Sequence, residues 1–204
     1  LVATTPQILA VHPSVPVASV RELIDYARAH RGTLNFASPG VGSSAHMAGE
    51  LFRSLARIDW VHVPYKGNQE AMQDVLEGRV QVLFSPAATL RPYVESGRLR
   101  ALAVAGAQRV ASLADLPTMA EAGLAGAEAM AWFGLVAPAG TPPAVIQRLN
   151  AAWKTAAADP AVRQSLLQQD VVPEHSAPEA FRAMLAAEIA KWSRIVAAAG
   201  IRAD

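Results

Sequence analysis

Short links join helices to strands throughout the first half of the chain. Two of these links, residues 77–80 and 96–99, share one pattern: a helical stretch ends on Gly78 or Gly97, and an apolar run follows a single arginine. Glycine ends helices because it adopts left-handed backbone angles without steric cost. Links this short after helices are typical of right-handed βαβ units, whose strands run parallel. We therefore expect residues 5–105 to form an intact α/β lobe around a parallel sheet.

The expected elements of this lobe have local signals of their own. Ser19 and Glu22 form a capping box, in which each side chain satisfies a free backbone N–H at the start of a helix. The residues that follow carry apolar side chains at helical spacing, and Gly32 ends the helix. Apolar runs predict the strands, at residues 8–11, 34–37, 60–63, 80–84 and 99–104.

Residues 106–204 are expected to form a partial, helix-rich second lobe together with the hinge. One apolar run, 130–137, predicts a buried strand. Capping side chains precede a proline or an acidic first turn at Thr141, Asp159 and Ser176, which predicts three helices. A lobe with one good strand cannot close a sheet of its own. We therefore expect further strands from a segment outside these residues.

Composition excludes several classes of protein. The chain has no cysteine, which excludes disulfide bonds, a thiol nucleophile and thiolate metal sites. Its 18 basic and 17 acidic side chains nearly cancel and form no basic block, so we expect no nucleic-acid partner. No apolar run reaches the ~18 residues that a membrane span needs. The chain begins at Leu1 rather than at methionine, which indicates a processed or truncated product.

Catalytic and metal-binding motifs are also missing from the sequence. The five histidines are scattered and no His-Glu-x-x-His motif occurs, so we expect no metal site. Gly40, Gly42 and Ser44 fall in the wrong order for a Gly-x-Ser-x-Gly nucleophile elbow. Ser44 and His46 lie two residues apart on a helix, where side chains point away from one another. The sequence therefore predicts no catalytic residue.

The most informative stretch is a glycine-rich turn, residues 38–46, which follows a predicted strand and opens a helix. Free N–H groups and the helix dipole make such a helix start attractive to anions. Glycines let the backbone approach a ligand closely, while hydroxyl and imidazole groups add donors. The turn therefore predicts a carboxylate or phosphate site, made by Ser38, Gly40, Gly42, Ser43, Ser44 and His46. The alternative is plain capping by Ser43 or Ser44, with His46 as a packing or surface side chain.

Two further loops follow predicted strands and are expected at the same edge of the sheet. Tyr65 and Lys66 follow one strand, and Ser85 follows the next. Ligands of open parallel sheets bind in the crevice at the carboxyl ends of the strands. We therefore add these three residues to the predicted ligand-binding set. The alternatives are a surface aromatic ring and a solvated charge for the first two, and a helix cap for Ser85.

The same turn also matches a dinucleotide fingerprint. Gly40, Gly42 and Ala45 have the spacing of the glycine/alanine form of this motif. The motif needs an acidic residue after the next strand, but Asp59 precedes that strand. Lys66 follows it and suits a phosphorylated ribose. An NADP-dependent enzyme that uses the turn at residues 40–45 therefore remains an alternative function.

Five blocks of sequence, in order, resemble one known family. Among them are Phe36-Ala-Ser-Pro-Gly-Val-Gly-Ser-Ser-Ala-His46 and Val61-His-Val-Pro-Tyr-Lys-Gly67. The blocks cover residues 34–52, 61–67, 99–104, 116–123 and 132–142. All five are similar to the tripartite tricarboxylate transporter receptors, also called Bug proteins. The resemblance extends over nearly the whole chain.

This resemblance implies a function and a fold. It implies a periplasmic-binding-protein-like, two-lobed α/β flytrap with one lobe intact and the other incomplete. Such a receptor captures a small carboxylate in the periplasm and delivers it to the permease subunits of a tripartite transporter. The loop 38–44 and the turn 65–67 would hold the ligand, with residues 132–134 near the hinge side. The resemblance implies a monomer, no cofactor and no enzymatic activity, while a ligand-sensing module without transport is a further alternative.

The sequence departs from the family in two places. Relatives have a longer N-terminal segment, which carries the opening strand of the first lobe and its own carboxylate loop. Many relatives also carry aspartate and asparagine where this chain has Ser85 and Pro86. Where that aspartate faces an amino group, its loss disfavours an amino-acid ligand. A neutral or hydroxylated acid is the expected ligand.

Overall fold

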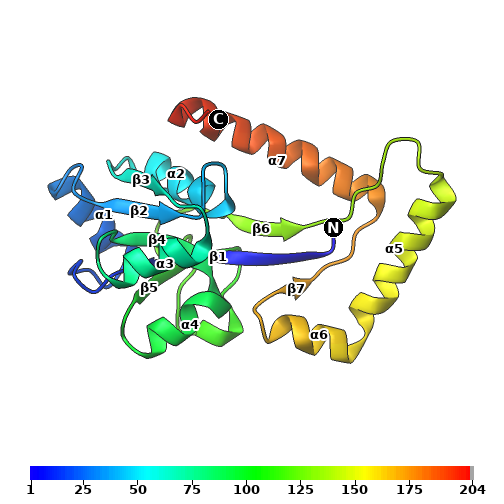
Figure 1. Ribbon diagram of the computed structural model, residues 1–204, viewed down its shortest axis with the longest axis horizontal. Coiled ribbons are helices and arrows are strands. Elements are labelled where there is room, and N and C mark those ends of the chain that lie inside the picture. Colours follow the sequence, from blue (N-terminus) through cyan, green and yellow to red (C-terminus); the bar gives the residue numbers. More distant parts are fainter. Residues whose placement is uncertain (203–204) are drawn as a thin grey trace. The chain divides into compact units, whose positions relative to one another are not determined.

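The computed structural model describes residues 1–202 and divides them between two units (Figure 1). The larger unit contains Pro6–Met130 and the chain from Arg194 onward, and the smaller unit contains Leu1–Thr5 and Ala131–Ser193. Within residues 1–202, no helix is both long enough and apolar enough to cross a membrane.

A mixed sheet forms the centre of the larger unit. Its strands are β1 (Ala3–Val11), β2 (Asn35–Ser38), β3 (Val61–Pro64), β4 (Val82–Pro86) and β5 (Arg100–Ala105), in the order β3-β2-β4-β1-β5. β2 is parallel to β3 and β4, as the short links predict. β1 is antiparallel to β4 and β5, so the prediction of a purely parallel sheet is wrong for this strand. Short links predict the direction only of strands that are joined by a helix. β1 lies instead between β4 and β5, which are distant from it in the sequence.

Helices cover both faces of this sheet. They are α1 (Val20–Ala29), α2 (Ser44–Ala56), α3 (Asn68–Leu76) and α4 (Ala87–Glu95). α3 and α4 pack on one face, where Met72, Val75 and Leu90 join the buried core. α2 packs on the other face and α1 lies beside it, where the Arg28 guanidinium donates a hydrogen bond to the Ala56 carbonyl at 2.7 Å.

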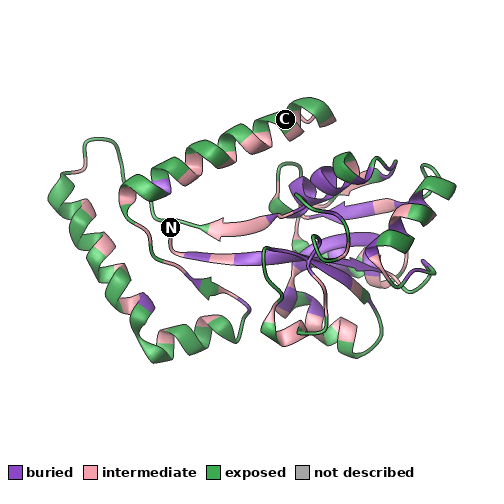
Figure 2. Ribbon diagram, turned by 180° about the vertical axis from the view of Figure 1, so that it is seen from behind, coloured by how far each residue is buried: buried purple, intermediate pink, exposed green. Residues whose placement is uncertain are grey.

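Aromatic side chains fill the space between α2 and the sheet, within the buried interior that Figure 2 shows in purple. Phe36 on β2 lies 5.2 Å from Trp60 between ring centroids, and Trp60 stacks on Phe52 of α2 at 5.1 Å. Gly49 makes this close approach of α2 possible, because a Cβ atom at that position would overlap the Phe36 ring. The start of α2 is thereby held close above the end of β2.

Residues 106–130 continue the larger unit beyond the predicted boundary at residue 105. They include one 3-10 turn, Ala111–Leu113, and then return along β5. Val104 donates its N–H to the Pro117 carbonyl at 2.8 Å, and Ala129 donates to the Ala105 carbonyl at 2.9 Å. This main-chain pairing leaves no periodic signal in the sequence, which explains the different boundary. How the two units correspond to the two expected lobes stays a prediction.

After residue 130 the chain is mostly helical. It forms β6 (Met130–Phe133), α5 (Pro143–Ala158), α6 (Pro160–Leu167), β7 (Val172–Pro173) and α7 (Pro178–Ala199). The three predicted helices are confirmed. Asp159 caps α6 by accepting hydrogen bonds from the N–H groups of Ala161 and Val162. Thr141 does not cap α5, since its hydroxyl donates to the Pro138 carbonyl at 2.8 Å instead.

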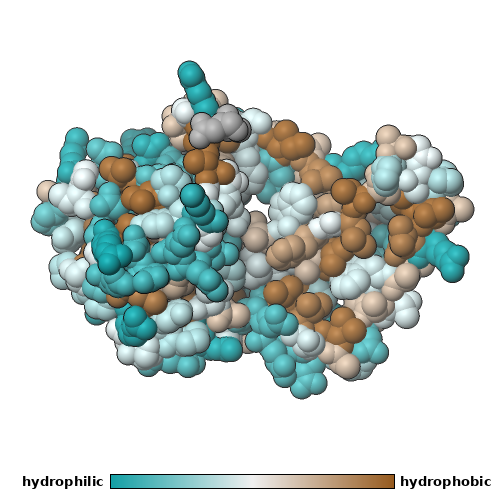
Figure 3. All heavy atoms as spheres, viewed as in Figure 1, coloured by the Kyte–Doolittle hydropathy of each residue, from teal (hydrophilic) through white to brown (hydrophobic). Residues whose placement is uncertain are grey.

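The predicted buried strand at residues 130–137 is wrong in both length and burial. β6 ends at Phe133, and the following residues Leu135 and Val136 are 66% and 83% exposed. An apolar run without a clear period does not by itself determine burial. Figure 3 shows apolar side chains gathered on the surface of the smaller unit, to which Val145 and Leu149 of α5 also contribute.

Candidate ligand-binding site

The loop between β2 and α2, residues 38–44, has a backbone shape that glycine makes possible. Gly40 and Gly42 have φ angles of 148° and 77°, which other residues adopt only with strain. Ser43 is the N-cap of α2: its hydroxyl oxygen accepts from the His46 N–H at 3.3 Å. The same hydroxyl donates to the Gly40 carbonyl at 2.8 Å. The capping alternative is therefore confirmed for Ser43, and both hydroxyl functions of this residue are used within the loop.

Other donors of this loop have no acceptor. Within the described chain, the backbone N–H groups of Val41, Ser44 and Ala45 make no hydrogen bond. The Ser44 oxygen accepts from the Gln7 side-chain amide at 3.3 Å, which leaves the Ser44 hydroxyl hydrogen free to donate. Ser44 is exposed to solvent. Three N–H groups and one hydroxyl thus stand at a helix start, where the dipole favours negative charge.

Gln7 is a site residue that the sequence analysis missed. Its side chain is almost fully buried, at 2% exposed, and its Oε1 atom has no hydrogen-bond partner within the described residues. The antiparallel register places Gln7 opposite Pro86, so that the middle of β1 meets the carboxyl end of β4. No motif marks this glutamine. Only the insertion of β1 between β4 and β5 brings it to the loop.

Two stacked imidazole rings support the loop from beneath. The rings of His46 on α2 and His62 on β3 lie 3.7 Å apart at an interplanar angle of 8°. The Gly42 N–H donates to His46 Nδ1 at 3.0 Å, and His62 Nε2 lies 2.6 Å from Ser38 Oγ. Ser38 Oγ also accepts from the Gly40 N–H at 3.2 Å. Each imidazole is therefore connected to one glycine of the loop. The sequence analysis did not identify His62.

Burial keeps both imidazoles neutral. Desolvation lowers the pKa of His46, and the nearby Arg53 guanidinium lowers it further. Desolvation, with His46 as the second cause, lowers the pKa of His62 to about 4. His46 is 4% exposed, so it is a packed side chain rather than a surface donor. The packing alternative for His46 therefore describes its position in the structure.

Tyr65 and Lys66 lie in the neighbouring turn with different roles. The Tyr65 N–H donates to the Ser38 carbonyl at 2.9 Å, which joins the two loops. The Tyr65 hydroxyl points the other way and donates to Asp74 Oδ2 at 2.7 Å. Burial and this hydrogen bond raise the phenol pKa to about 12. The Lys66 side chain is exposed.

Ser85 is buried near the end of β4 but faces away from Gln7. It pairs with Ile8 in the antiparallel ladder, and Ile8 belongs to the core under α3 and α4. Successive residues of a strand point to opposite faces of the sheet. Ser85 does not cap α4, which begins at Ala87 without a side-chain cap. Whether Ser85, Tyr65 and Lys66 contact a ligand stays a prediction.

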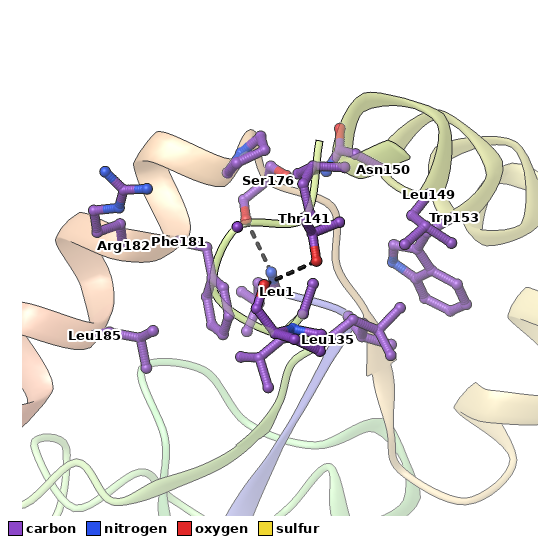
Figure 4. A pocket seen from close by; sticks show the side chains of 17 residues that line it. Leu1, Leu135, Thr141, Leu149, Asn150, Trp153, Ser176, Phe181, Arg182 and Leu185 are labelled. Carbon is purple, nitrogen blue, oxygen red and sulfur yellow. Dashed lines mark hydrogen bonds between the residues drawn. The ribbon is translucent and has the colours of Figure 1, made fainter. Parts of the chain in front are cut away.

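A cavity lies wholly within the smaller unit, and the candidate loop is not part of its lining (Figure 4). Its volume is about 410 Å³, and most of its lining is apolar, including Leu149, Trp153 and Phe181. Arg182 also lines it. No residue of this cavity was predicted to bind a ligand. Within residues 1–202, no group of three or more histidine, cysteine, aspartate or glutamate side chains is arranged to hold a metal ion.

Comparison of the sequence with known protein families gives a match over nearly the whole chain. Residues 1–201 match the model of the tripartite tricarboxylate transporter family receptors. The chain belongs to this family. It is 36% identical to a UPF0065 protein in the tcbD-tcbE intergenic region of Pseudomonas sp. (strain P51), over 96% of this chain and 59% of that protein. It is 32% identical to BugT of Bordetella pertussis, over 99% of this chain and 62% of BugT.

Several solved structures have the same fold. R. palustris Rpa4515 with adipate gives a TM-score of 0.87 at 35% identity, over 98% of this chain and 67% of that one. MatC from Rhodopseudomonas palustris with bound malate gives a TM-score of 0.82 at 31% identity, over 95% of this chain and 67% of that one. The periplasmic binding protein BugD gives a TM-score of 0.84 at 28% identity, over 99% of this chain and 68% of that one. The predicted family and the predicted α/β fold of periplasmic binding proteins are therefore confirmed. The chain spans about three-fifths of the length of the curated relatives.

Proposed function

We propose that this protein binds a small carboxylate at the loop between β2 and α2. The observation that carries the proposal is the group of unpaired donors at the start of α2. The N–H groups of Val41, Ser44 and Ala45 and the Ser44 hydroxyl have no acceptor within the described residues. The structures of family receptors with adipate and with malate support a carboxylate as the ligand class.

A carboxylate suits these donors chemically. It is an acceptor-only group with two oxygens, and hydrogen bonds to an ionised acceptor are about twice as strong as neutral ones. The partial positive charge at the helix start adds to this attraction. Gln7 holds the Ser44 oxygen, so the hydroxyl hydrogen is the part of Ser44 that remains for a ligand. Binding at this loop needs no cofactor, and we propose no enzymatic activity.

The finer parts of the function rest on the family. We propose that the receptor works in the periplasm as a monomer and delivers its ligand to the permease subunits of a tripartite transporter. Closure of two lobes over the ligand would present the loaded form to that permease. Ser85 and Pro86 replace the acidic and amide side chains that many relatives carry. This replacement supports a neutral or hydroxylated acid over an amino acid.

Isothermal titration calorimetry with malate and adipate tests the proposal. We expect one of these acids to bind, and Ser44→Ala to weaken binding about tenfold, because one charge-assisted hydrogen bond is lost. Ser54→Ala is the matched control, since Ser54 is an exposed serine near the other end of α2. It should leave the affinity unchanged. Equal affinities for the parent and Ser44→Ala, or binding of NADP in place of both acids, would contradict the proposal.

A further inference from the structure

The stacked imidazoles of His46 and His62 lie between the candidate loop and the aromatic core. Phe36 packs against both rings, with centroid distances of 6.1 Å to His46 and 4.8 Å to His62. One nitrogen of each ring contacts the loop, since His46 Nδ1 accepts from the Gly42 N–H and His62 Nε2 contacts Ser38 Oγ. The two imidazoles therefore act on the loop through these nitrogens.

The contact between Gly42 and His46 exists in only one protonation state. The Gly42 N–H is a donor, so the Nδ1 atom that faces it at 3.0 Å must carry no hydrogen. A protonated His46 has hydrogen on both ring nitrogens and would place two hydrogens against each other. Two imidazolium rings stacked at 3.7 Å would also repel. The observed loop conformation thus requires His46 to be neutral.

We infer that His46 and His62 are positioning residues, and that the loop 38–44 keeps its ligand-binding shape only while His46, stacked on His62, is uncharged. This inference rests on the proposed function, in which that loop binds the carboxylate. At acidic pH the hydrogen bond between Gly42 and His46 is then expected to break, and the N–H donors at the start of α2 to lose their common orientation. Ligand affinity should fall with the pH for a reason that lies in the protein, in addition to any titration of the ligand.

The surroundings of the pair favour the neutral forms. Arg53, one of two charged residues near His46 on α2, is ion-paired with the other, Glu50, at 2.6 Å. From β2 the neighbours are the uncharged Phe36 and Ser38, and Phe36 packs in turn against Trp60. Burial lowers the pKa values of both imidazoles, that of His62 to about 4. The pair therefore titrates below the usual histidine range, as two coupled groups.

The first part of the test uses the protein without ligand. Nuclear magnetic resonance follows the imidazole carbon-bound protons and the backbone amides of Gly40 and Gly42 from pH 7.5 downward. We expect both glycine amides to shift together with the His46 and His62 protons. The exposed His30 at the end of α1 serves as internal control. Glycine amides that stay constant while the two imidazoles titrate would overturn the inference.

The second part separates positioning from packing with three variants. His46→Asn keeps an acceptor at the δ position but cannot become charged, whereas His46→Leu removes the acceptor. At neutral pH we expect His46→Leu to weaken malate or adipate binding about tenfold, and His46→Asn to weaken it less. The parent affinity should fall by up to about tenfold per pH unit below the pKa of the pair, more steeply than that of His46→Asn. His30→Asn should follow the parent.

The two parts distinguish this inference from the proposed function. The titration of the ligand itself is common to all variants and cancels in the ratio of their affinities. Equal slopes with pH for the parent and His46→Asn would overturn the positioning role even if a carboxylate binds. If neither acid binds at any pH while the glycine amides follow the imidazoles, the proposed function fails and the coupling between histidines and loop stands.

Discussion

At the residue scale, the Gln7 side chain makes one hydrogen bond to the candidate loop and has one buried atom without a hydrogen-bond partner among residues 1–202. Its amide nitrogen holds the Ser44 oxygen, but its Oε1 atom is buried without a partner within the described residues. A buried polar atom that lacks a hydrogen bond costs about 1–3 kcal/mol. A residue that destabilises the fold while orienting a donor at the loop is expected where binding, rather than stability, has shaped the sequence.

Replacing this glutamine should therefore separate stability from binding. We expect Gln7→Leu to raise the free energy of unfolding by about 1 kcal/mol, because the unpaired Oε1 is removed at similar volume. The same change should weaken carboxylate binding, because the Ser44 hydroxyl is no longer oriented. Urea unfolding and calorimetry measure the two effects. Gln147→Leu, at an exposed glutamine of α5, is the control. A less stable Gln7→Leu protein would contradict this account.

The histidine pair should make stability depend on pH. The pKa of His62 is about 4 in the folded protein and 6.5 in an unfolded chain, so the unfolded chain binds more protons between these values. The stability that neutral His62 contributes is then fully present above pH 6.5 and is lost as the pH falls toward 4. Between pH 7 and pH 4.5 we expect the parent to lose about 2 kcal/mol more than His62→Gln. Equal losses in urea unfolding would refute this assignment.

The sequence predicted part of this site and could not predict the rest. Residues 38–46 are contiguous, so glycines, serines and a helix start were visible together. Gln7 and His62 reach the loop from β1 and β3, and local patterns do not report which strands become neighbours. The residue type of Tyr65 did not reveal that its hydroxyl binds Asp74, on the side away from the loop.

At the scale of elements, the position of α2 depends on one glycine. A Cβ atom at Gly49 would overlap the ring of Phe36 on β2. Phe36 in turn packs against both imidazoles beneath the candidate loop. The helix start that carries the unpaired donors is therefore placed by contacts one to two turns further along α2. Helical periodicity predicted α2 itself, but it did not predict how close the helix lies to the sheet.

A double-mutant cycle tests this contact. Gly49→Ala should lower the free energy of unfolding by about 1–3 kcal/mol through overpacking, despite the better helix propensity of alanine. Phe36→Leu alone should also destabilise, because it leaves a cavity. The double variant should lose less free energy of unfolding than the two single variants lose in sum, because the smaller leucine side chain makes room for the alanine methyl group. Additive costs in urea unfolding would show that the two residues do not press on each other.

At the scale of the whole molecule, the sheet differs from what the sequence indicated. The strand order β3-β2-β4-β1-β5 includes one strand, β1, that is antiparallel to its neighbours β4 and β5. This order depends on pairing between strands distant in sequence, which short links and periodicity do not encode. The family and the α/β class were predictable because five ordered blocks of sequence carried them. The apolar cavity of the smaller unit had no sequence signal, because its lining comes from separated segments.

The central claim is that a carboxylate binds at the start of α2, and one measurement tests it most directly. Backbone amide resonances are recorded while malate or adipate is titrated into the protein. The account predicts that the amides of Val41, Ser44 and Ala45 shift most, because they are the unpaired donors of the loop. Shifts confined to the apolar cavity around Trp153 and Phe181, with the amides at the start of α2 unchanged, would contradict it.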